Sequence, residues 1–271
     1  MPTRQAAQIR AAMDTHDQVC VADSWERLEA LVRLEPLSVV VFNPASDGTM
    51  DATRACKLIR KYASIPFVAY VPVEAAFVRG VARMANDGLQ DVVVYRSDDS
   101  PSPFHKTLER VSSLPQVAIL AGELQPWLRL LPTPLVDVLM DDLHQPHKYA
   151  SAEDIAAAAN MTLSALYRSF RTARLKPPKN FVVGARAFRG YVYLRDVSFS
   201  IRDVAVKLGY THQRIFAHHF ECVLGECPSR VRYSLDDAEA VRRIVSWLGS
   251  STGDATPSPS PFARDYGLAV I

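Results

Sequence analysis

Polar and aromatic side chains are interleaved in the segment THQRIFAHHFECVLG, which runs from Thr211 to Gly225. Phe216 and Phe220 are four residues apart, so they share one face of a helix and predict that this face is buried. Arg214 then lies on the outward face. There its guanidinium could donate two hydrogen bonds to the edge of a guanine. The segment therefore predicts a helix whose exposed side can contact a nucleic acid.

A second helix precedes this one and would support it. The segment SIRDVAVKL puts four apolar residues on one helical face, namely Ile201, Val204, Ala205 and Leu208. Gly209 then permits the positive φ of a tight turn, and Gly225 and Pro228 close the following helix. Helix, short glycine turn and helix form the unit whose second helix can enter the major groove of DNA.

An earlier copy of this design is present in SAEDIAAAANMTLSALYRSF. Ser151 is expected to cap its first helix, with Asp154 three residues further on, and Asn160 with Met161 is expected to make the turn. Thr162 would cap the second helix. Its Leu166 and Phe170 repeat the spacing of the two phenylalanines, while Ile155 and Ala156 face inward. Between the two copies, PKNFVVGARAFRGYVYL predicts a long helix that could hold both at a fixed separation.

The second unit resembles the C-terminal DNA-binding domain of the AraC/XylS family. The residues that carry this resemblance are Ile201, Val204, Ala205, Leu208, Gly209, Tyr210, Phe216, Phe220, Gly225, Pro228 and Arg232. The resemblance implies two recognition helices in successive major grooves on one face of double-stranded DNA. It implies contacts to bases and phosphates from Gln213, Arg214, Ile215, Ala217 and His218 in the second unit. In the first unit it implies contacts from Ser164, Tyr167 and Arg168, with Thr162 and Arg171 on phosphates, which fix register without reading sequence.

Two positions depart from the family pattern. Leu175 stands where the family usually has a glycine after the first recognition helix, and Gly190 stands where the connecting helix usually has an alanine. Glycine inside a helix costs about 1 kcal/mol relative to alanine, so we expect a softer connecting helix.

A metal site is an alternative use of the same segment. His218, His219 and Cys222 fall within about one helical turn and Cys227 follows, and these are ligand types that suit Zn²⁺. By the family pattern, however, His219 faces inward and His218 faces the groove, so the two would point apart. We therefore expect no metal and no other cofactor.

The N-terminal half alternates β-rich and helical segments from Gln18 to Val111, which predicts a parallel sheet with crossover helices. The predicted strands lie in QVCVA, SVVVF, PFVAYV and DVVVY. The predicted helices lie in SWERLEALVRL, ATRACKLIRKY, EAAFVRGVARMAND and FHKTLERV. The strands VVVF and VVVY are apolar on both faces, as expected where helices cover each side.

This half resembles a receiver domain of response regulators, a flavodoxin-like α/β fold, in an incomplete or degenerate form. Asn43 stands at the position of the phosphate-accepting Asp, Arg96 at that of the Lys, and Ala69 near that of the hydroxyl residue. An amide cannot accept a phosphoryl group as a carboxylate can, so we expect no aspartyl phosphorylation. Asp47 and Asp51 are alternative acceptors, but exposed loop carboxylates are usually only solvated. Dimerisation, docking on the helical half and binding of another protein remain open as its role.

Composition sets the wider limits. The chain is 48% hydrophobic and 22% charged, which favours folded domains over disorder. No apolar run reaches the ~20 residues of a membrane span and no signal peptide begins the chain, so we expect a cytoplasmic protein. The four cysteines form no CxxC pair, which favours reduced thiols. From Ser151 to Tyr233 there are 13 Lys and Arg against 6 Asp and Glu, or +7, which leaves −5 for the rest of a chain of net charge +2.

The predicted fold class is a flavodoxin-like α/β domain followed by an all-α domain with two helix-turn-helix units. The expected boundaries are 16–114 for the receiver-like domain, 115–133 for a linker, 134–235 for the double helix-turn-helix domain, 236–248 for a C-terminal helix and 249–271 for a disordered tail.

The predicted function is that of a sequence-specific transcription factor on promoter DNA. RNA polymerase or another regulator is a further candidate partner, and the N-terminal half is a candidate for homodimer formation. The alternative is a protein-interaction regulator that has lost DNA specificity. An enzyme is not expected, because no Gly-rich phosphate loop follows a strand and no set of nucleophile, base and acid is present.

Overall fold

The computed structural model of the chain describes residues 7, 9–11, 18–45, 51–72, 74–98 and 100–249. It divides into two compact units. The first comprises Met1–Leu114 with Asp196–Ser198, and the second comprises Pro115–Arg195 with Phe199–Ile271.

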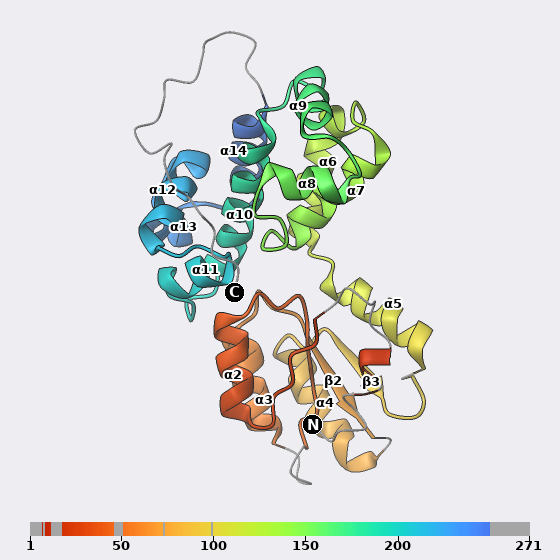
Figure 1. Cartoon of the computed structure of the whole chain (residues 1–271). Helices are drawn as coiled ribbons and strands as arrows, with labels where there is room; N and C mark the ends of the chain where they lie inside the picture. The colour runs from red at the N-terminus through yellow and green to blue at the C-terminus, as the bar shows by residue number, and fades with distance from the viewer. Residues whose placement is uncertain are drawn as a thin grey trace. The chain divides into compact units, whose positions relative to one another are not determined.

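The first unit is built on a three-stranded parallel sheet in the order β1-β2-β3. Its strands are β1 (Val40–Phe42), β2 (Phe67–Val71) and β3 (Asp91–Val94). Its helices include α2 (Trp25–Leu34), α3 (Ala52–Lys61), α4 (Ala75–Asn86) and α5 (Pro101–Ser112). The crossover helices that the sequence predicts are thus present, and the sheet is parallel as expected (Figure 1).

Side chains from both faces of the central strand enter a core. On one face Val68 and Tyr70 pack with α5, where the Tyr70 ring stacks on Phe104 at 5.8 Å between centroids. On the other face the Phe67 ring lies 6.1 Å from that of Phe42, which in turn contacts Trp25 of α2. Every residue of β2 is buried, which explains its continuous apolar sequence.

The predicted strand in QVCVA is wrong. Gln18–Ala22 lie within the described residues and form no strand. Val19 packs against the core, but Val21, which a strand would place on the same face, is 45% exposed, and Cys20 is exposed, so the segment does not bury one face as a sheet strand would. The β-rich composition alone was insufficient to predict a strand here.

Helices make up the described part of the second unit, together with one isolated antiparallel bridge between Leu175 and Gly249. They are α6 (Pro115–Leu128), α7 (Thr133–His144), α8 (Ala152–Ala158), α9 (Leu163–Thr172), α10 (Pro178–Leu194), α11 (Ile201–Lys207), α12 (Gln213–Leu224), α13 (Pro228–Ser234) and α14 (Asp237–Leu248). Figure 1 shows α10 running between the pair α8 and α9 and the pair α11 and α12.

Residues 115–133, for which a connector was expected, are mostly helical and belong to the second unit. The buried side chains of α6 are Val117, Leu120, Leu124 and Leu128, and the helix packs on α7 and α14. Pro115 does not oppose this helix, because the first position needs no backbone N–H donor.

The C-terminal helix begins as predicted, with the Asp236 side chain accepting a hydrogen bond from the N–H of Glu239. Of the predicted disordered tail only Gly249 is described, and it pairs with Leu175; residues 250–271 lie outside the described residues. Among the helices that are described, none combines the length and apolarity of a membrane span.

Candidate nucleic-acid interface

Local side-chain caps define the first helix-turn-helix unit. The Ser151 hydroxyl accepts a hydrogen bond from the N–H of Asp154 at 3.3 Å, and the Asp154 carboxylate accepts one from the N–H of Ser151 at 2.9 Å. This reciprocal capping box starts α8, as the sequence predicts. Asn160 has φ 57° in the turn, and the Thr162 hydroxyl accepts from the N–H of Ala165 at 3.2 Å to start α9.

The second helix-turn-helix unit, α11 and α12, repeats the capping box and the turn with a positive φ. Ser200 and Asp203 form a capping box at the start of α11, a signal that the sequence analysis missed although it has the spacing of Ser151 and Asp154. Gly209 takes φ 76° in the turn, as predicted, and Gly225 takes φ 73° at the end of α12. Each recognition helix is thus fixed at its start by a turn of defined geometry.

One face of each recognition helix is buried. Leu166 and Phe170 of α9 and Phe216 and Phe220 of α12 all lie in the core. The rings of Phe216 and Phe220 are 5.4 Å apart. The predicted inward faces are therefore confirmed for both helices.

The predicted contact residues lie on the opposite side. In the first helix-turn-helix unit all five predicted contact residues are exposed, with Tyr167 at 41% despite its large ring: Thr162, Ser164, Tyr167, Arg168 and Arg171. In the second helix-turn-helix unit Gln213, Arg214 and His218 are exposed, while Ile215 and Ala217 are half-buried. The structure thus gathers the ten residues into two groups, one at each recognition helix.

The recognition helices are both anchored on α10. The Phe170 ring of α9 meets the Phe181 ring of α10 edge to face, with 6.1 Å between centroids. On the other side Phe216 of α12 packs over Gly190, so closely that a Cβ added at Gly190 would lie 2.9 Å from Cε2 of that ring. Gly190 therefore has a packing role: the missing methyl group lets α12 approach α10.

The second departure from the family pattern also has a local account. Arg174 adopts the left-handed conformation after α9, with φ 57°, and Leu175 does not. This conformation costs a residue with a Cβ about 1–2 kcal/mol. Leu175 is buried and pairs with Gly249, so its side chain adds an apolar contact to the unit.

The four candidate zinc ligands have different surroundings. Nε2 of His218 lies 3.7 Å from Sγ of Cys222, but Nδ1 of His219 lies 3.2 Å from the Tyr210 hydroxyl. Burial lowers the pKa of His219. Sγ of Cys227 lies 3.2 Å from the Ser229 hydroxyl. Within the described residues, His, Cys, Asp and Glu side chains form no group of three or more that could hold a metal ion.

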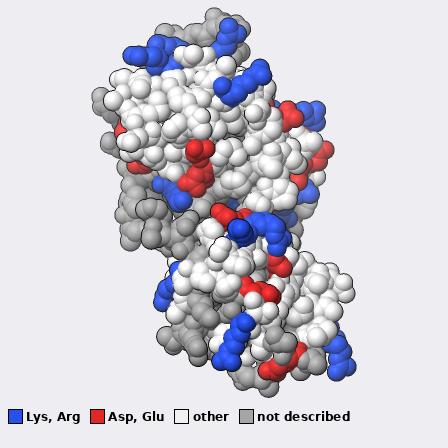
Figure 2. Space-filling view, turned by 90° about the vertical axis from the view of Figure 1, so that its right-hand side faces the viewer, with Lys and Arg blue, Asp and Glu red and all other residues white. Residues whose placement is uncertain are grey.

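The distribution of charge differs from what the sequence count indicates. Arg186, Arg189 and Lys207 are buried, so three of the cations counted between Ser151 and Tyr233 cannot reach a polyanion. Lys207 lies 5.0 Å from the centre of the Tyr193 ring, which compensates part of its lost hydration. Arg168 and Arg171 of α9 remain exposed, and Figure 2 shows Lys and Arg along the upper edge of the view, at the height of α9 in Figure 1.

In the N-terminal unit that contains the sheet, the residues at the receiver-like positions do not form a phosphate-accepting site. The Asn43 side chain accepts a hydrogen bond from the N–H of Ala45 at 2.9 Å, just after β1. Ala69 is fully buried within β2, where it pairs with Phe42 and Val92, so it does not lie at the strand end that the hydroxyl position requires. Arg96 lies over the Tyr95 ring, at 5.2 Å.

The two alternative acceptor carboxylates gain no support. Asp51 accepts a hydrogen bond from the N–H of Arg54 at 2.9 Å, which makes it the cap of α3. Asp47 lies outside the described residues.

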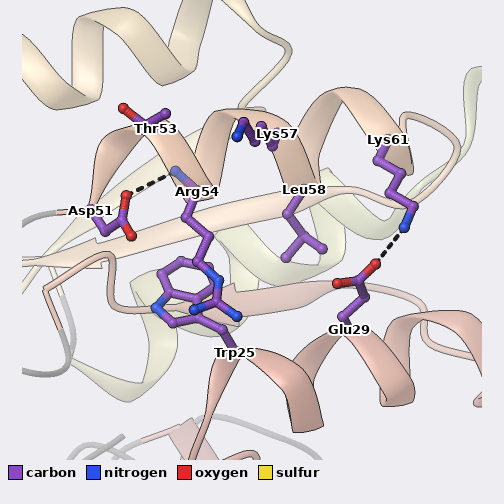
Figure 3. Close-up of a pocket in the computed structure, with 8 residues that line it drawn as sticks. All are labelled: Trp25, Glu29, Asp51, Thr53, Arg54, Lys57, Leu58 and Lys61. Carbon is purple, nitrogen blue, oxygen red and sulfur yellow. Dashed lines mark hydrogen bonds and ion pairs between the residues drawn. The ribbon is translucent and has the colours of Figure 1, made fainter.

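An open groove of about 500 Å³ lies between α2 and α3 of the first unit (Figure 3). Lys61 pairs with Glu29 across it at 2.5 Å. Arg54 pairs with Glu26 and stacks on Trp25. These pairings leave little uncompensated charge, so the groove gives no indication of a reaction or of a charged ligand.

Comparison with known proteins places the helical unit. Residues 155–234 match the helix-turn-helix domain model HTH_18. The HTH-type transcriptional regulator MtrA of Neisseria gonorrhoeae is 25% identical over 164 residues, which cover 55% of this chain and 54% of that protein. The chain thus spans about half the length of this curated relative, and no solved structure matches it. From this match and the capped helices described above, residues 155–234 form a helix-turn-helix domain of the AraC type.

Proposed function

We propose that this chain is a sequence-specific transcription factor that inserts α9 and α12 into successive major grooves of promoter DNA. The observation that carries the proposal is the common support of the two helices. Both present an exposed face with polar and basic residues, and both are anchored through phenylalanines on the same helix, α10. The name of the relative MtrA, a transcriptional regulator, supports the same function.

The proposed roles of the contact residues follow from their chemistry. Arg214 and Gln213 read base edges, because a guanidinium fits guanine and a carboxamide fits adenine. Arg171 neutralises a phosphate. The Thr162 hydroxyl already accepts a hydrogen bond from the N–H of Ala165, but its own hydrogen stays free to be donated to a phosphate oxygen.

For the N-terminal unit, which contains the sheet, we propose a degenerate receiver-like module that acts without phosphorylation. The consecutive parallel order β1-β2-β3 supports this assignment, because the last three strands of a flavodoxin-like sheet are neighbours in the same order. With Asn43 after β1 the acceptor carboxylate is lacking. The module would then serve in homodimer formation or in binding RNA polymerase or another regulator, and the protein would act in the cytoplasm without enzymatic activity.

The test is selection of duplexes by the full chain from a random-sequence library. We expect an enriched motif with two separated elements, one for each recognition helix. Affinity for it should fall linearly with salt on a double-logarithmic plot, because Lys and Arg displace counterions from phosphates. If no sequence is enriched while one protein partner is captured reproducibly, the chain is a protein-interaction regulator.

A further inference from the structure

Arg186 is a buried cation of α10, with 4% of its surface exposed. Its Nε donates to the carbonyl oxygen of Pro146 at 3.2 Å, and its Nη2 donates to that of Tyr149 at 3.1 Å. Both carbonyls belong to the segment between α7 and α8. The guanidinium therefore ties the entry of the first helix-turn-helix unit to α10.

The same guanidinium also contacts the second helix-turn-helix unit, formed by α11 and α12. Its carbon lies 5.5 Å from the centre of the Tyr210 ring, in the turn between α11 and α12. The Tyr210 hydroxyl lies 3.2 Å from Nδ1 of His219, and its ring lies 5.5 Å from that of Phe216. Tyr210 thus connects Arg186 to two residues of the second recognition helix.

Arginine suits this position because its planar group carries several N–H donors in a fixed fork and can also contact an aromatic ring. Its Nε and Nη2 donate to the two carbonyls, while its carbon lies close enough to the Tyr210 ring for a cation–π contact. Burial raises the pKa of Tyr210 to about 12, so the ring stays neutral at physiological pH. A lysine would keep the charge but lose the fixed fork of donors that reaches both carbonyls.

The phenylalanine contacts on α10 do not by themselves fix the rotation of one recognition helix relative to the other, whereas the contacts of Arg186 can. Phenylalanine packing resists separation of helices but is not strongly directional. Hydrogen bonds from a guanidinium have a fixed geometry. One side chain that contacts both helix-turn-helix units can therefore define the rotation of one relative to the other.

We propose that Arg186 is a positioning residue that fixes α12 relative to α9 and thereby sets the base-pair spacing at which both helices bind one duplex. The part about spacing rests on the proposed function, whereas the part about placement does not. The two parts are tested by separate measurements.

Placement is tested without DNA, in the full chain. Nitroxide labels are attached after Ser164→Cys and Gln213→Cys, with Cys20, Cys222 and Cys227 replaced by serine, and the distance distribution is measured by pulsed electron resonance. We expect one narrow distribution with Arg186, and a broadened or shifted one after Arg186→Met. If Arg186→Met does not fold, Arg186→Lys decides in the same way.

Arg189→Met is the matched control. Arg189 is also buried on α10, and its guanidinium lies 4.5 Å from the ring of Tyr193, a residue of the same helix. We expect this variant to keep the narrow distribution. An unchanged distribution after Arg186→Met, or equal broadening in both variants, overturns the placement role.

Spacing is tested on duplexes that the wild-type chain selects from the random library, with base pairs inserted or removed between the two elements. The wild type should lose affinity steeply as the spacing changes. Arg186→Met should bind the selected spacing about ten-fold more weakly and show a flatter dependence on spacing. An equal loss at every spacing overturns the spacing role. If the wild type selects no sequence, the proposed function is wrong, and the distance measurement still decides on placement.

Discussion

Arg214 lies in the first turn of α12 with its side chain exposed, two residues before the buried Phe216. Because a bidentate contact to guanine is worth about 1–3 kcal/mol, we expect Arg214→Ala to weaken binding to the selected duplex roughly ten-fold or more. Base preference should relax at one position of the motif, which a repeated selection with the variant would show.

Arg79→Ala is the control for this loss of charge, because Arg79 is exposed on α4 of the first unit. It should leave the selected motif unchanged. If Arg214→Ala and Arg79→Ala weaken binding equally, Arg214 contributes only general charge, and its assignment to a base edge is wrong.

Asp142 is a second residue with a measurable consequence. It is fully buried on α7, and in the described structure neither of its carboxylate oxygens has a hydrogen-bond partner. Burial raises its pKa well above the ordinary value, against the attraction of Arg186 and with the repulsion of Asp141. Since the folded-state pKa is the higher one, the associated stability is present at low pH and is lost as pH rises through it.

Asp142→Asn should therefore flatten the fall of the unfolding free energy with rising pH and leave the variant more stable than the wild type under alkaline conditions. Urea unfolding at a series of pH values measures this. Asp141→Ala is the contrast, because Asp141 accepts a hydrogen bond from the Tyr149 hydroxyl at 2.7 Å, so its loss should cost about 0.5–1.5 kcal/mol. Parallel pH profiles for Asp142→Asn and the wild type would contradict the assignment.

At the scale of the helix, intrinsic helix propensity and core packing have opposite effects at Gly190. Propensity alone predicts that Gly190→Ala gains about 1 kcal/mol. The added methyl group would meet Phe216 at 2.9 Å and Leu208 at 3.2 Å, and overpacking of a core costs about 1–3 kcal/mol. We therefore expect a net loss of stability and a displaced α12, measured as a lower midpoint of urea unfolding.

Gly122→Ala is its matched control. Gly122 lies in α6, and a Cβ there would have nothing within 4 Å. Propensity should then act unopposed and raise the unfolding free energy by about 0.5–1 kcal/mol. Equal gains from both substitutions would show that Gly190 has no packing role.

Local signals predicted the elements that local chemistry determines. Ser151 and Thr162 cap their helices, Gly209 takes the positive φ of its turn, and Phe216 with Phe220 defines the inward face of α12. Each of these needs only neighbours within about one helical turn. The sequence therefore located both recognition helices and their exposed faces.

Contacts between distant segments were not predictable in the same way. Arg186 counts as surface charge in a sequence, yet the carbonyls that bury it come from residues 146 and 149. The close approach of Phe216 to Gly190 likewise joins two elements that the alternation of apolar residues treats separately. The prolines between Pro115 and Pro134 favoured a connector, although Val117, Leu120, Leu124 and Leu128 have the spacing of a helix with one buried face.

At the scale of the whole chain, the place of α6 decides which piece can fold alone. The second unit begins at Pro115, and α6 contributes Val117, Leu120, Leu124 and Leu128 to its core. Burying each such side chain stabilises a fold by about 1.5–3 kcal/mol, so the four together approach the entire stability of a typical domain. A piece that begins at residue 134 lacks this helix and leaves the facing sides of α7 and α14 uncovered.

We therefore expect residues 115–249 to unfold cooperatively on heating and residues 134–249 to lack a cooperative transition, as followed by circular dichroism. The shorter piece keeps both recognition helices, so the comparison separates the sequence motif from the folded unit that presents it. Equal melting temperatures for the two pieces would show that α6 is dispensable and that the domain starts near Pro134. Loss of the transition in both would show that the second unit depends on the first for its stability.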